Sequence, residues 1–551
     1  MQGQMMQMPL LISSLIVHAE RHHADREVVS RRVEGDIHRT TYRELAARSR
    51  RMAKALAALG VSIGTGQRVG TLAWNGYRHM ELYYAVSGSG AVLHTINPRL
   101  HPDQIVYIAD HAEDQVLFFD MTFLPLIQAI AGRTQTIKHF VAMTDRAHMP
   151  AADAAAKIPG LLCYEELLEA QDDQFSWPSF DENTASSLCY TSGTTGNPKG
   201  VLYSHRSTLL HTFAIALPDS LNVGAADVIL PVVPMFHVNA WGLPYAACMV
   251  GAKLVFPGPG LDGKSLYELF EGEGVTLSAG VPTVWQGLLG HVDANGLKFS
   301  TMRRTVIGGS ACPPAMMRKF GDDYDVHVMH AWGMTEMSPV GTVASFKGKH
   351  HAQTREERYG VMSKQGRVVY GVDMKTVNEA GDELPFGSNE SGDVLVRGPW
   401  IAAQYFKGEG GDPLVHGQDG DWFPTGDVAR LDADGYMQIT DRSKDVIKSG
   451  GEWIGSIDLE NIAMAHPAVA MAACIAAFHP KWDERPLLVV VKKPGANVAA
   501  AELLAFFDGK IAKWWTPDDV VFVDAIPLGA TGKMQKNKLR EQFKDHKLPT
   551  A

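Results

Sequence analysis

Short apolar runs alternate with helical patterns along the first part of the chain. Residues 68–74, 91–96 and 115–119 are predicted strands, and residues 41–59 and 105–111 are predicted helices. Strands that alternate with helices pair in parallel, because a parallel pair needs a long crossover connection. The alternation therefore predicts βαβ units in which helices cover the faces of a parallel sheet.

The pattern of predicted strands and helices changes twice along the rest of the chain. The alternating pattern continues over residues 228–320, but from about residue 366 strand-like runs and Gly-bearing turns predict a β subdomain. We expect an α/β fold. A large N-terminal domain of layered α/β/α subdomains plus the β subdomain covers residues 1–440. A hinge over residues 441–445 and a small mobile α+β lid domain over residues 446–551 follow.

The composition excludes several classes of protein. The chain of 551 residues has 51 Lys and Arg against 61 Asp and Glu, a net charge of −10, so it lacks the basic surface that nucleic acid requires. Five scattered cysteines without metal-ligand spacing indicate a reducing compartment. No apolar run reaches the ~18 residues of a membrane span. Apolar residues 5–17 lack the basic flank of a signal peptide and predict a buried helix, so we expect a cytoplasmic protein.

One stretch combines the residue types that bind phosphate groups. Residues 190–200 read YTSGTTGNPKG, with three glycines, hydroxyl side chains and a lysine. Glycines let successive backbone N–H groups converge on one anion, hydroxyls add donors, and the lysine adds positive charge. The spacing is not that of a Walker A loop. The stretch predicts a polyphosphate site, and its alternative is a polar surface loop.

This stretch and five later motifs, in the same order, resemble the signature motifs of the adenylate-forming superfamily. The later motifs are WGMTE at 332–336, TGD at 425–427, DRSKD at 441–445, KSGGE at 448–452 and GK at 532–533. The resemblance covers nearly the whole chain. It is closest to the bacterial medium- and long-chain fatty acyl-CoA synthetase branch, near the methylmercaptopropionate-CoA ligases.

The resemblance implies an AMP-forming acid–thiol ligase of fatty acid metabolism that uses ATP, Mg²⁺ and CoA. A free carboxylate resists attack by a thiol because it is negatively charged and its oxide is a poor leaving group. An acyl-AMP intermediate removes both obstacles, and the protein positions the groups and stabilises charge. The resemblance also implies that the lid rotates about Lys444 between the two half-reactions.

The resemblance assigns roles in adenylation to particular residues. Lys533 bridges the substrate carboxylate and the α-phosphate, where negative charge grows. Glu336 is a ligand of Mg²⁺, with Ser192 near the metal. Thr335 contacts the α-phosphate, and His237 lies at the mouth of the acyl pocket beside the reacting groups.

Further residues are assigned to nucleotide and CoA binding. Asp427 accepts the ribose hydroxyls, Arg442 reaches the same ribose, and Trp332 stacks at the adenine. The remaining positions are Thr191, Gly193, Thr194, Thr195, Gly196, Lys199, Gly309, Ser310, Ala311, His330, Ala331, Gly333, Met334, Lys448, Gly450, Gly451, Glu452 and Trp453.

The acyl pocket is expected along residues 234–242, PMFHVNAWG, which contain no Lys or Arg. Acids with a second charge are therefore disfavoured. The substrate-binding residues are His237, Val238, Trp241 and Gly309, although Trp241 could instead be a core residue. Pocket contacts discriminate single methylenes by only ~1–3 kcal/mol, so chain length stays open.

Several functions remain in competition at this point. The first is a ligase for medium- to long-chain fatty acids, and its neighbours are ligases for 3-methylmercaptopropionate or another short acid. An acyl-AMP ligase that loads a carrier protein, a luciferase-like oxygenase and a non-catalytic binder are the alternatives of another class. The expected partners are the acid, ATP and CoA, with no nucleic acid, and the resembling branch implies a homodimer.

Overall fold

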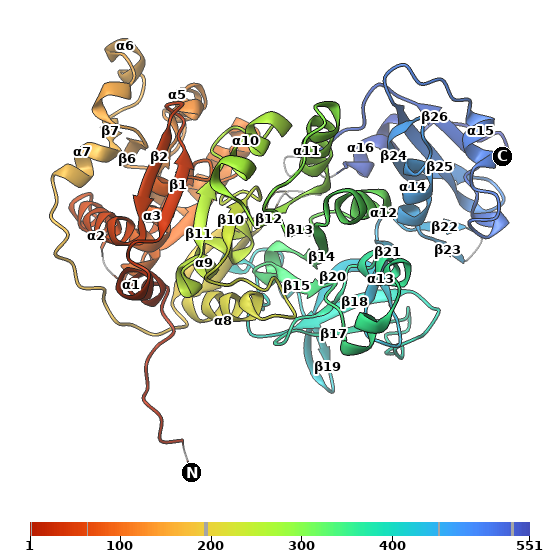
Figure 1. The fold of residues 1–551 in the computed structure, drawn as a ribbon, viewed down its shortest axis with the longest axis horizontal. Helices are drawn as coiled ribbons and strands as arrows, with labels where there is room; N and C mark the ends of the chain where they lie inside the picture. The colour runs from red at the N-terminus through yellow and green to blue at the C-terminus, as the bar shows by residue number, and fades with distance from the viewer. Residues whose placement is uncertain (2, 63, 192–196, 450–451, 530–533) are drawn as a thin grey trace.

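The computed structural model describes residues 1, 3–62, 64–191, 197–449, 452–529 and 534–551, with the backbone alone at Glu452 and Trp453. The α/β and β parts of residues 1–442 lie at one end and in the centre of the molecule, and the final α+β part lies at the other end (Figure 1). Over these residues the strands form four sheets.

The first sheet has the order β7-β6-β5-β3-β4-β8-β9 in the described chain. All its neighbouring pairs are parallel except β8 with β9. The strands are β3 (Arg68–Leu72), β4 (Val92–Thr95), β5 (Asp114–Phe119), β6 (His139–Ala142), β7 (Leu162–Cys163), β8 (Ala185–Tyr190) and β9 (Gly200–Ser204). The associated helices are α2 (Tyr42–Ala58), α3 (Tyr77–Gly88), α4 (Pro102–Ala112), α5 (Leu124–Ile130), α6 (Ala152–Ala155) and α7 (Tyr164–Glu169), with short turns η1 (Met121–Phe123) and η2 (Arg146–His148).

The second sheet has the order β16-β15-β14-β13-β12-β10-β11-β1-β2 in the described chain. Its strands are β1 (Glu27–Arg31), β2 (Ile37–Thr41), β10 (Val228–Pro231), β11 (Lys253–Phe256), β12 (Leu277–Gly280), β13 (Arg304–Ile307), β14 (His327–Gly333), β15 (Val340–Val343) and β16 (Arg367–Val368). The helices are α1 (Ser13–His22), α8 (His205–Ala216), α9 (Leu243–Val250), α10 (Gly263–Glu273), α11 (Pro282–Ala294), α12 (Pro314–Arg318) and α13 (Arg355–Met362). The short turns are η3 (Val238–Gly242), η4 (Lys319–Asp323), η5 (Thr335–Met337) and η6 (Gly348–Ala352). From β1 to β14 the neighbouring strands are parallel, so their carboxyl ends meet at one edge.

Helix α3 packs against strands of both large sheets, and every one of its residues is buried. A helix that is buried on all sides needs partners for any charge it carries. Arg78 is paired with Glu34 and Glu165, and Glu81 is paired with Arg48. The helix therefore joins the two sheets into one core.

Two smaller sheets complete the described molecule. One contains β17 (Asp373–Val377), β18 (Gly392–Arg397), β19 (Val415–Gly417), β20 (Gly420–Leu431) and β21 (Met437–Arg442), all antiparallel, beside the turn η7 (Phe406–Gly408). The other contains β22 (Ile447–Ser449), β23 (Glu452–Ile454), β24 (Val469–His479), β25 (Asp483–Lys492) and β26 (Asp519–Phe522), with α14 (Ser456–Met464), α15 (Ala500–Ala505), α16 (Lys536–Gln542) and η8 (Lys513–Trp515). The chain leaves one sheet after Arg442 and enters the other at Ile447, across the predicted hinge.

The α/β class predicted from the sequence is confirmed, but some local predictions are wrong. The helix expected over residues 5–17 begins at Ser13, because Met5, Met6 and Met8 are exposed and only the later apolar residues face the core. Residues 143–184, for which no element was predicted, contain strand β7 and helix α7. Among the described helices, none has the length and apolar composition needed to span a bilayer.

Candidate active site

The loop after β13 and the end of β14 lie at the edge where the parallel strands end. A Cβ atom on Gly308 would come within 2.8 Å of the Ala331 carbonyl oxygen and 3.1 Å of Trp241 Cη2, so only glycine fits there. Gly309 has φ +80°, the left-handed region that favours glycine. The loop thus brings Gly308, Ala331 and the Trp241 indole together. Ser310 is exposed and Ala311 is half-buried beside them.

Asp427 is a buried carboxylate whose two oxygens both have partners. The Trp332 indole Nε1 donates to Oδ2 at 2.8 Å, and Arg442 Nε lies 3.0 Å from Oδ1. Asp427 and Arg442 face each other across β20 and β21. Three residues predicted to bind the nucleoside are therefore joined in one group. The indole contact adds a positioning role to the stacking role expected of Trp332.

Glu336 is supported by a tyrosine that the sequence motifs do not contain. Tyr405 Oη donates to Glu336 Oε1 at 2.8 Å, and Tyr203 Oη donates to the Thr335 carbonyl at 2.6 Å. Burial and the nearby Glu336 charge raise the pKa of Tyr405, so its hydroxyl stays protonated and donates. The Lys199 ammonium lies 4.7 Å from the centroid of the Tyr405 ring. Tyr405 therefore connects the predicted metal ligand to the lysine of the phosphate-binding stretch.

The described ends of the phosphate-binding stretch are hydrogen-bonded to each other. The Thr191 backbone N–H donates to the Lys199 carbonyl at 2.8 Å, and the Lys199 N–H donates to Thr191 Oγ1 at 3.2 Å. These bonds continue the β8–β9 hairpin to the base of the loop. The predicted site residues that lie outside the described residues are Ser192, Gly193, Thr194, Thr195, Gly196, Gly450, Gly451 and Lys533, together with the side chains of Glu452 and Trp453.

His330 and Gly333 have structural roles close to this site. His330 Nε2 accepts the backbone N–H of Cys312 at 3.2 Å. Burial lowers the pKa of His330 to about 4, so the ring is neutral and can accept that bond. A Cβ on Gly333 would lie 1.9 Å from the Pro339 carbonyl oxygen, which excludes every other residue. Met334 follows, half-buried, where its N–H also bonds the Pro339 carbonyl.

The predicted acyl-binding segment forms a left-handed turn. Val238, Asn239, Ala240 and Trp241 in η3 all have φ between 47° and 56°. The Asn239 amide donates to Ser187 Oγ at 3.0 Å and accepts from Tyr83 Oη at 3.3 Å, which anchors the turn to β8 and α3. Non-glycine residues in this conformation are strained, and such strain is found at ligand sites. The turn buries Val238 and Trp241, while His237 before it is half-buried.

The predicted hinge and CoA residues lie at the start of the C-terminal part. Lys444 lies between β21 and β22, and burial lowers the pKa of its ammonium. Lys448 belongs to β22, where its backbone N–H donates to Glu484 Oε2 at 2.8 Å. Lys448 is thus part of the C-terminal sheet, whereas Asp427 belongs to the sheet before the hinge.

The chain matches family models over most of its length. A family described as AMP-binding enzyme matches residues 16–406, and its C-terminal domain family matches residues 458–533. The order of these matches agrees with the order of the predicted large and small domains.

Individual relatives are similar over the full chain. The 3-methylmercaptopropionyl-CoA ligase of Ruegeria lacuscaerulensis is 57% identical over 545 residues, covering 99% of both chains. The medium-chain fatty acid–CoA ligase of Ectopseudomonas oleovorans is 52% identical over 545 residues, covering 99% of this chain and 98% of that protein. The crystal structure of an anthranilate CoA ligase with anthranoyl-AMP superposes with a TM-score of 0.85 at 24% identity, covering 98% of each chain, which shows a shared fold.

Proposed function

The chain belongs to the AMP-binding enzyme family, and from that premise we propose that it is an ATP-dependent acyl-CoA ligase that works through an acyl-AMP intermediate. The observation that carries the proposal is the full-length identity to CoA ligases, combined with the joining of Asp427, Trp332 and Arg442 in one group. A non-catalytic binder would not need both a ribose-type carboxylate and the supported Glu336.

Adenylation needs a fixed nucleotide and stabilised charge. Asp427 accepts the ribose hydroxyls, and its contacts with Trp332 and Arg442 support this by fixing the carboxylate. Glu336 fits Mg²⁺, because a carboxylate is the hard oxygen donor this ion prefers and Tyr405 already orients it. Mg²⁺ supplies charge neutralisation on the phosphates when bound. Lys533 stabilises the charge that grows between the acid and the α-phosphate.

Thioester formation needs a different set of residues at the same site. The lid rotates about Lys444, withdraws Lys533 and brings the Lys448 segment toward the acyl-AMP. The change of sheet between Arg442 and Ile447 supports a hinge there, since only a short segment has to reorient.

The acid is an uncharged-tail monocarboxylate, and our first choice is a medium- to long-chain fatty acid. The pocket segment contains no Lys or Arg, and the buried Trp241 indole lies against Gly308. A polar or doubly charged tail would leave its groups without partners there.

A short thioether acid is the second candidate. The specific observation that favours it is the 57% identity to a 3-methylmercaptopropionyl-CoA ligase over 99% of both chains. A methylthio tail is about as apolar as a short alkyl chain, so the pocket wall formed by Trp241 and Gly308 would accept it.

The test is pyrophosphate release with ATP and Mg²⁺ over straight-chain acids from three to eighteen carbons and 3-methylmercaptopropionate, with and without CoA. We expect CoA-stimulated release with a maximum at one chain length, and a shifted maximum for Trp241→Ala. Trp177→Phe, a tryptophan that packs against Phe175 and Gly88, is the matched control and should keep the wild-type profile.

Each outcome separates the candidates. A maximum at 3-methylmercaptopropionate selects the thioether acid over a fatty acid. Release that CoA does not increase would indicate a carrier protein as the acceptor, and no release with any acid would contradict the ligase proposal. An unchanged profile in Trp241→Ala would return this residue to a core role.

A further inference from the structure

Glu34 is a buried carboxylate with one unused oxygen. It lies in the turn between β1 and β2, and its side chain is 5% exposed. Its Oε1 accepts from Arg78 Nη1 at 2.7 Å and from Thr144 Oγ1 at 2.9 Å. Its Oε2 is buried and accepts no hydrogen bond from any described residue. A buried carboxylate oxygen without a partner is costly, so its surroundings should contain a cationic or donating group.

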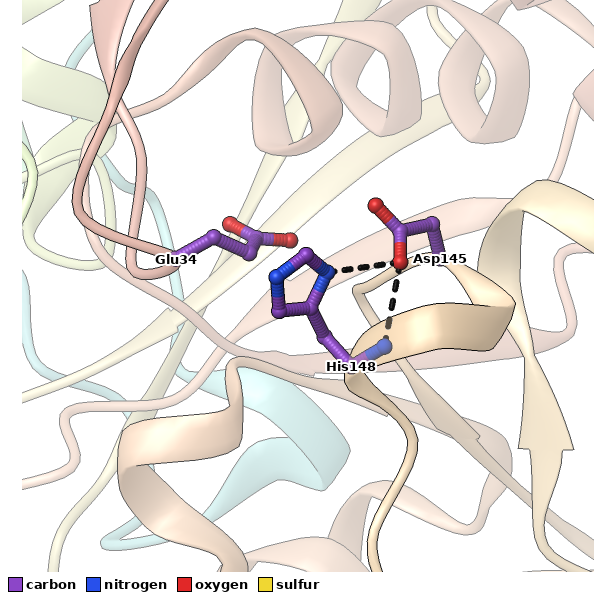
Figure 2. Close-up of side chains that lie close together, drawn as sticks. All are labelled: Glu34, Asp145 and His148. Atoms are coloured by element: carbon purple, nitrogen blue, oxygen red, sulfur yellow. Dashed lines mark hydrogen bonds and ion pairs between the residues drawn. The ribbon is translucent and has the colours of Figure 1, made fainter.

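Two further metal-binding side chains lie close to the Glu34 carboxylate, in the segment after β6. Asp145 is the N-cap of η2, and its Oδ1 accepts the His148 backbone N–H at 3.1 Å and pairs with His148 Nδ1 at 2.7 Å. Glu34, Asp145 and His148 point toward one another (Figure 2). Each offers a ligand atom, and these atoms lie within 4.8 Å of one another, which is true of no other such group among the described residues.

We propose that Glu34, Asp145 and His148 form a binding site for a divalent transition metal of the Zn²⁺ class. One imidazole nitrogen and two carboxylate oxygens are ligands that Zn²⁺ accepts, whereas Mg²⁺ and Ca²⁺ prefer oxygen alone. A tetrahedral ion needs its ligands about 3.3 Å apart. The ligand atoms now lie within 4.8 Å of one another, and the His148 and Asp145 side chains are partly exposed. The exposed side leaves a fourth position for water.

The local charge favours a cation at this position. The Arg78 guanidinium is shared between Glu34 and Glu165, at 2.7 Å and 2.8 Å. Arg48 also pairs with Glu165 and with Glu81, so two positive charges serve three carboxylates. Asp145 adds a further carboxylate on the open side, and its partner in the described structure is His148. A divalent ion would neutralise the remaining negative charge and use the free Glu34 oxygen.

The position of the site indicates its role. Glu34 belongs to the hairpin of the second sheet, while Asp145 and His148 follow β6 of the first sheet. A metal ion held by all three would tie the rims of the two sheets together. The role is therefore structural, and it is independent of the ATP site.

The test uses the full-length protein, stripped of metal with a chelator and kept free of ATP, to which one metal ion at a time is then added. Zn²⁺ affinity is measured by competition with a chelating dye, and thermal unfolding is followed with Zn²⁺, Mg²⁺ or Ca²⁺. We expect one tightly bound Zn²⁺ per chain and a higher Tm with Zn²⁺ alone. Glu34→Gln, which keeps an acceptor for Arg78 and Thr144, and His148→Ala should each weaken binding at least tenfold.

His416→Ala is the matched control, because His416 is an exposed histidine that also lies between two aspartates, Asp412 and Asp421. It should bind Zn²⁺ like the wild type. Failure of the wild type to bind stoichiometric Zn²⁺ would overturn the proposal. So would unchanged affinity in His148→Ala, a half-exposed position that should not disturb folding, or loss of binding in His416→Ala.

Discussion

At the scale of single residues, the candidate site depends on partners for its buried carboxylates. Asp427 accepts a hydrogen bond from Trp332 and forms an ion pair with Arg442. Glu336 accepts a hydrogen bond from Tyr405. Each partner comes from a different part of the chain. Such support fixes the carboxylate before the nucleotide or the metal arrives, which is how a site is preorganised.

Tyr405→Phe removes the hydroxyl that orients Glu336 and keeps the ring against Lys199. We expect the Mg²⁺ concentration for half-maximal pyrophosphate release to rise about tenfold, because loss of an outer-shell partner weakens metal binding by that order. Tyr370→Phe is the control, since Tyr370 is 88% exposed. An unchanged Mg²⁺ requirement in Tyr405→Phe would remove this residue from the site.

Asp120→Asn tests a buried acid near the Glu34 turn. Burial raises the pKa of Asp120 to about 7 from an ordinary 3.8, while its Oδ2 accepts the Trp74 N–H at 2.7 Å. Between these values the folded protein holds a proton that the unfolded chain releases, so stability falls as pH rises from about 4 to 7. The asparagine in the variant carries no titrating carboxyl group, so the stability of the variant does not show this fall with pH.

The free energy of unfolding of Asp120→Asn, relative to that of the wild type, should therefore rise by up to about 1.4 kcal/mol per pH unit between about pH 4 and pH 7. Above about pH 7 the difference should stay constant. Urea unfolding midpoints at pH 5 and pH 8 measure it. An equal difference between the two proteins at both pH values would show that the folded state does not retain that proton.

At the scale of elements, the left-handed turn η3 is the least expected feature. Four consecutive non-glycine residues with positive φ cost roughly 1–2 kcal/mol each. Burial of the turn and the Asn239 bonds to Ser187 and Tyr83 offset that cost. The result is a rigid wall that presents Trp241 to Gly308.

Ala240→Gly should therefore leave stability unchanged or raise it by up to ~1 kcal/mol, because glycine adopts positive φ without strain. Ala214→Gly, in the right-handed helix α8, is the matched control and should lower stability by about 1 kcal/mol or more. Denaturant unfolding of both variants gives the comparison. Equal losses in the two would contradict the strain assigned to η3.

At the scale of the whole molecule, helix α14 contacts strand β21 across the predicted hinge. Asp441 Oδ2 accepts the Ser456 backbone N–H at 2.7 Å, so a residue before Lys444 holds the first turn of α14. Asp445 pairs with Arg540 at 2.6 Å, and both lie after Lys444. Rotation about Lys444 must break the first contact and can preserve the second.

Lys533→Ala tests whether the lid works in two orientations, one for each half-reaction. We expect adenylation to fall by orders of magnitude, because the charge near the α-phosphate loses its partner. Thioester formation from supplied acyl-AMP should stay close to the wild-type rate. Single-turnover assays of each half-reaction measure this, and equal losses in both would contradict a lid with two working orientations.

Asp441→Ala removes a contact that the proposed rotation about Lys444 would break. We expect the ratio of the two half-reaction rates to change about tenfold, the effect of one hydrogen bond to a charged group. Asp445→Ala, whose partner moves with it, should lower both rates equally or neither. A ratio unchanged in Asp441→Ala would mean that the contact survives the rotation.

Much of the fold and part of the site could be predicted from local sequence. The strands at β3, β4 and β5 follow from short apolar runs, and helix α2 follows from its apolar face and the Thr41–Glu44 capping box. The nucleoside-binding roles of Asp427, Trp332 and Arg442 are expected from the motifs, but their direct contacts with one another are not. Tyr405, Asp145 and His148 could not be predicted, because they stand outside any motif and act only through distant neighbours.

The sequence by itself determined the alternation of strands and helices and the order of the motifs, because spacing along the chain encodes these. The class of reaction followed from the resemblance of those motifs to a known family. The tertiary structure decided which side chains meet. Trp332 reaches Asp427 across 95 positions and Glu336 reaches Tyr405 across 69. Such pairs depend on strand order and on which edge of a sheet the loops share. Local periodicity does not carry that information, since it fixes only the face on which a residue lies.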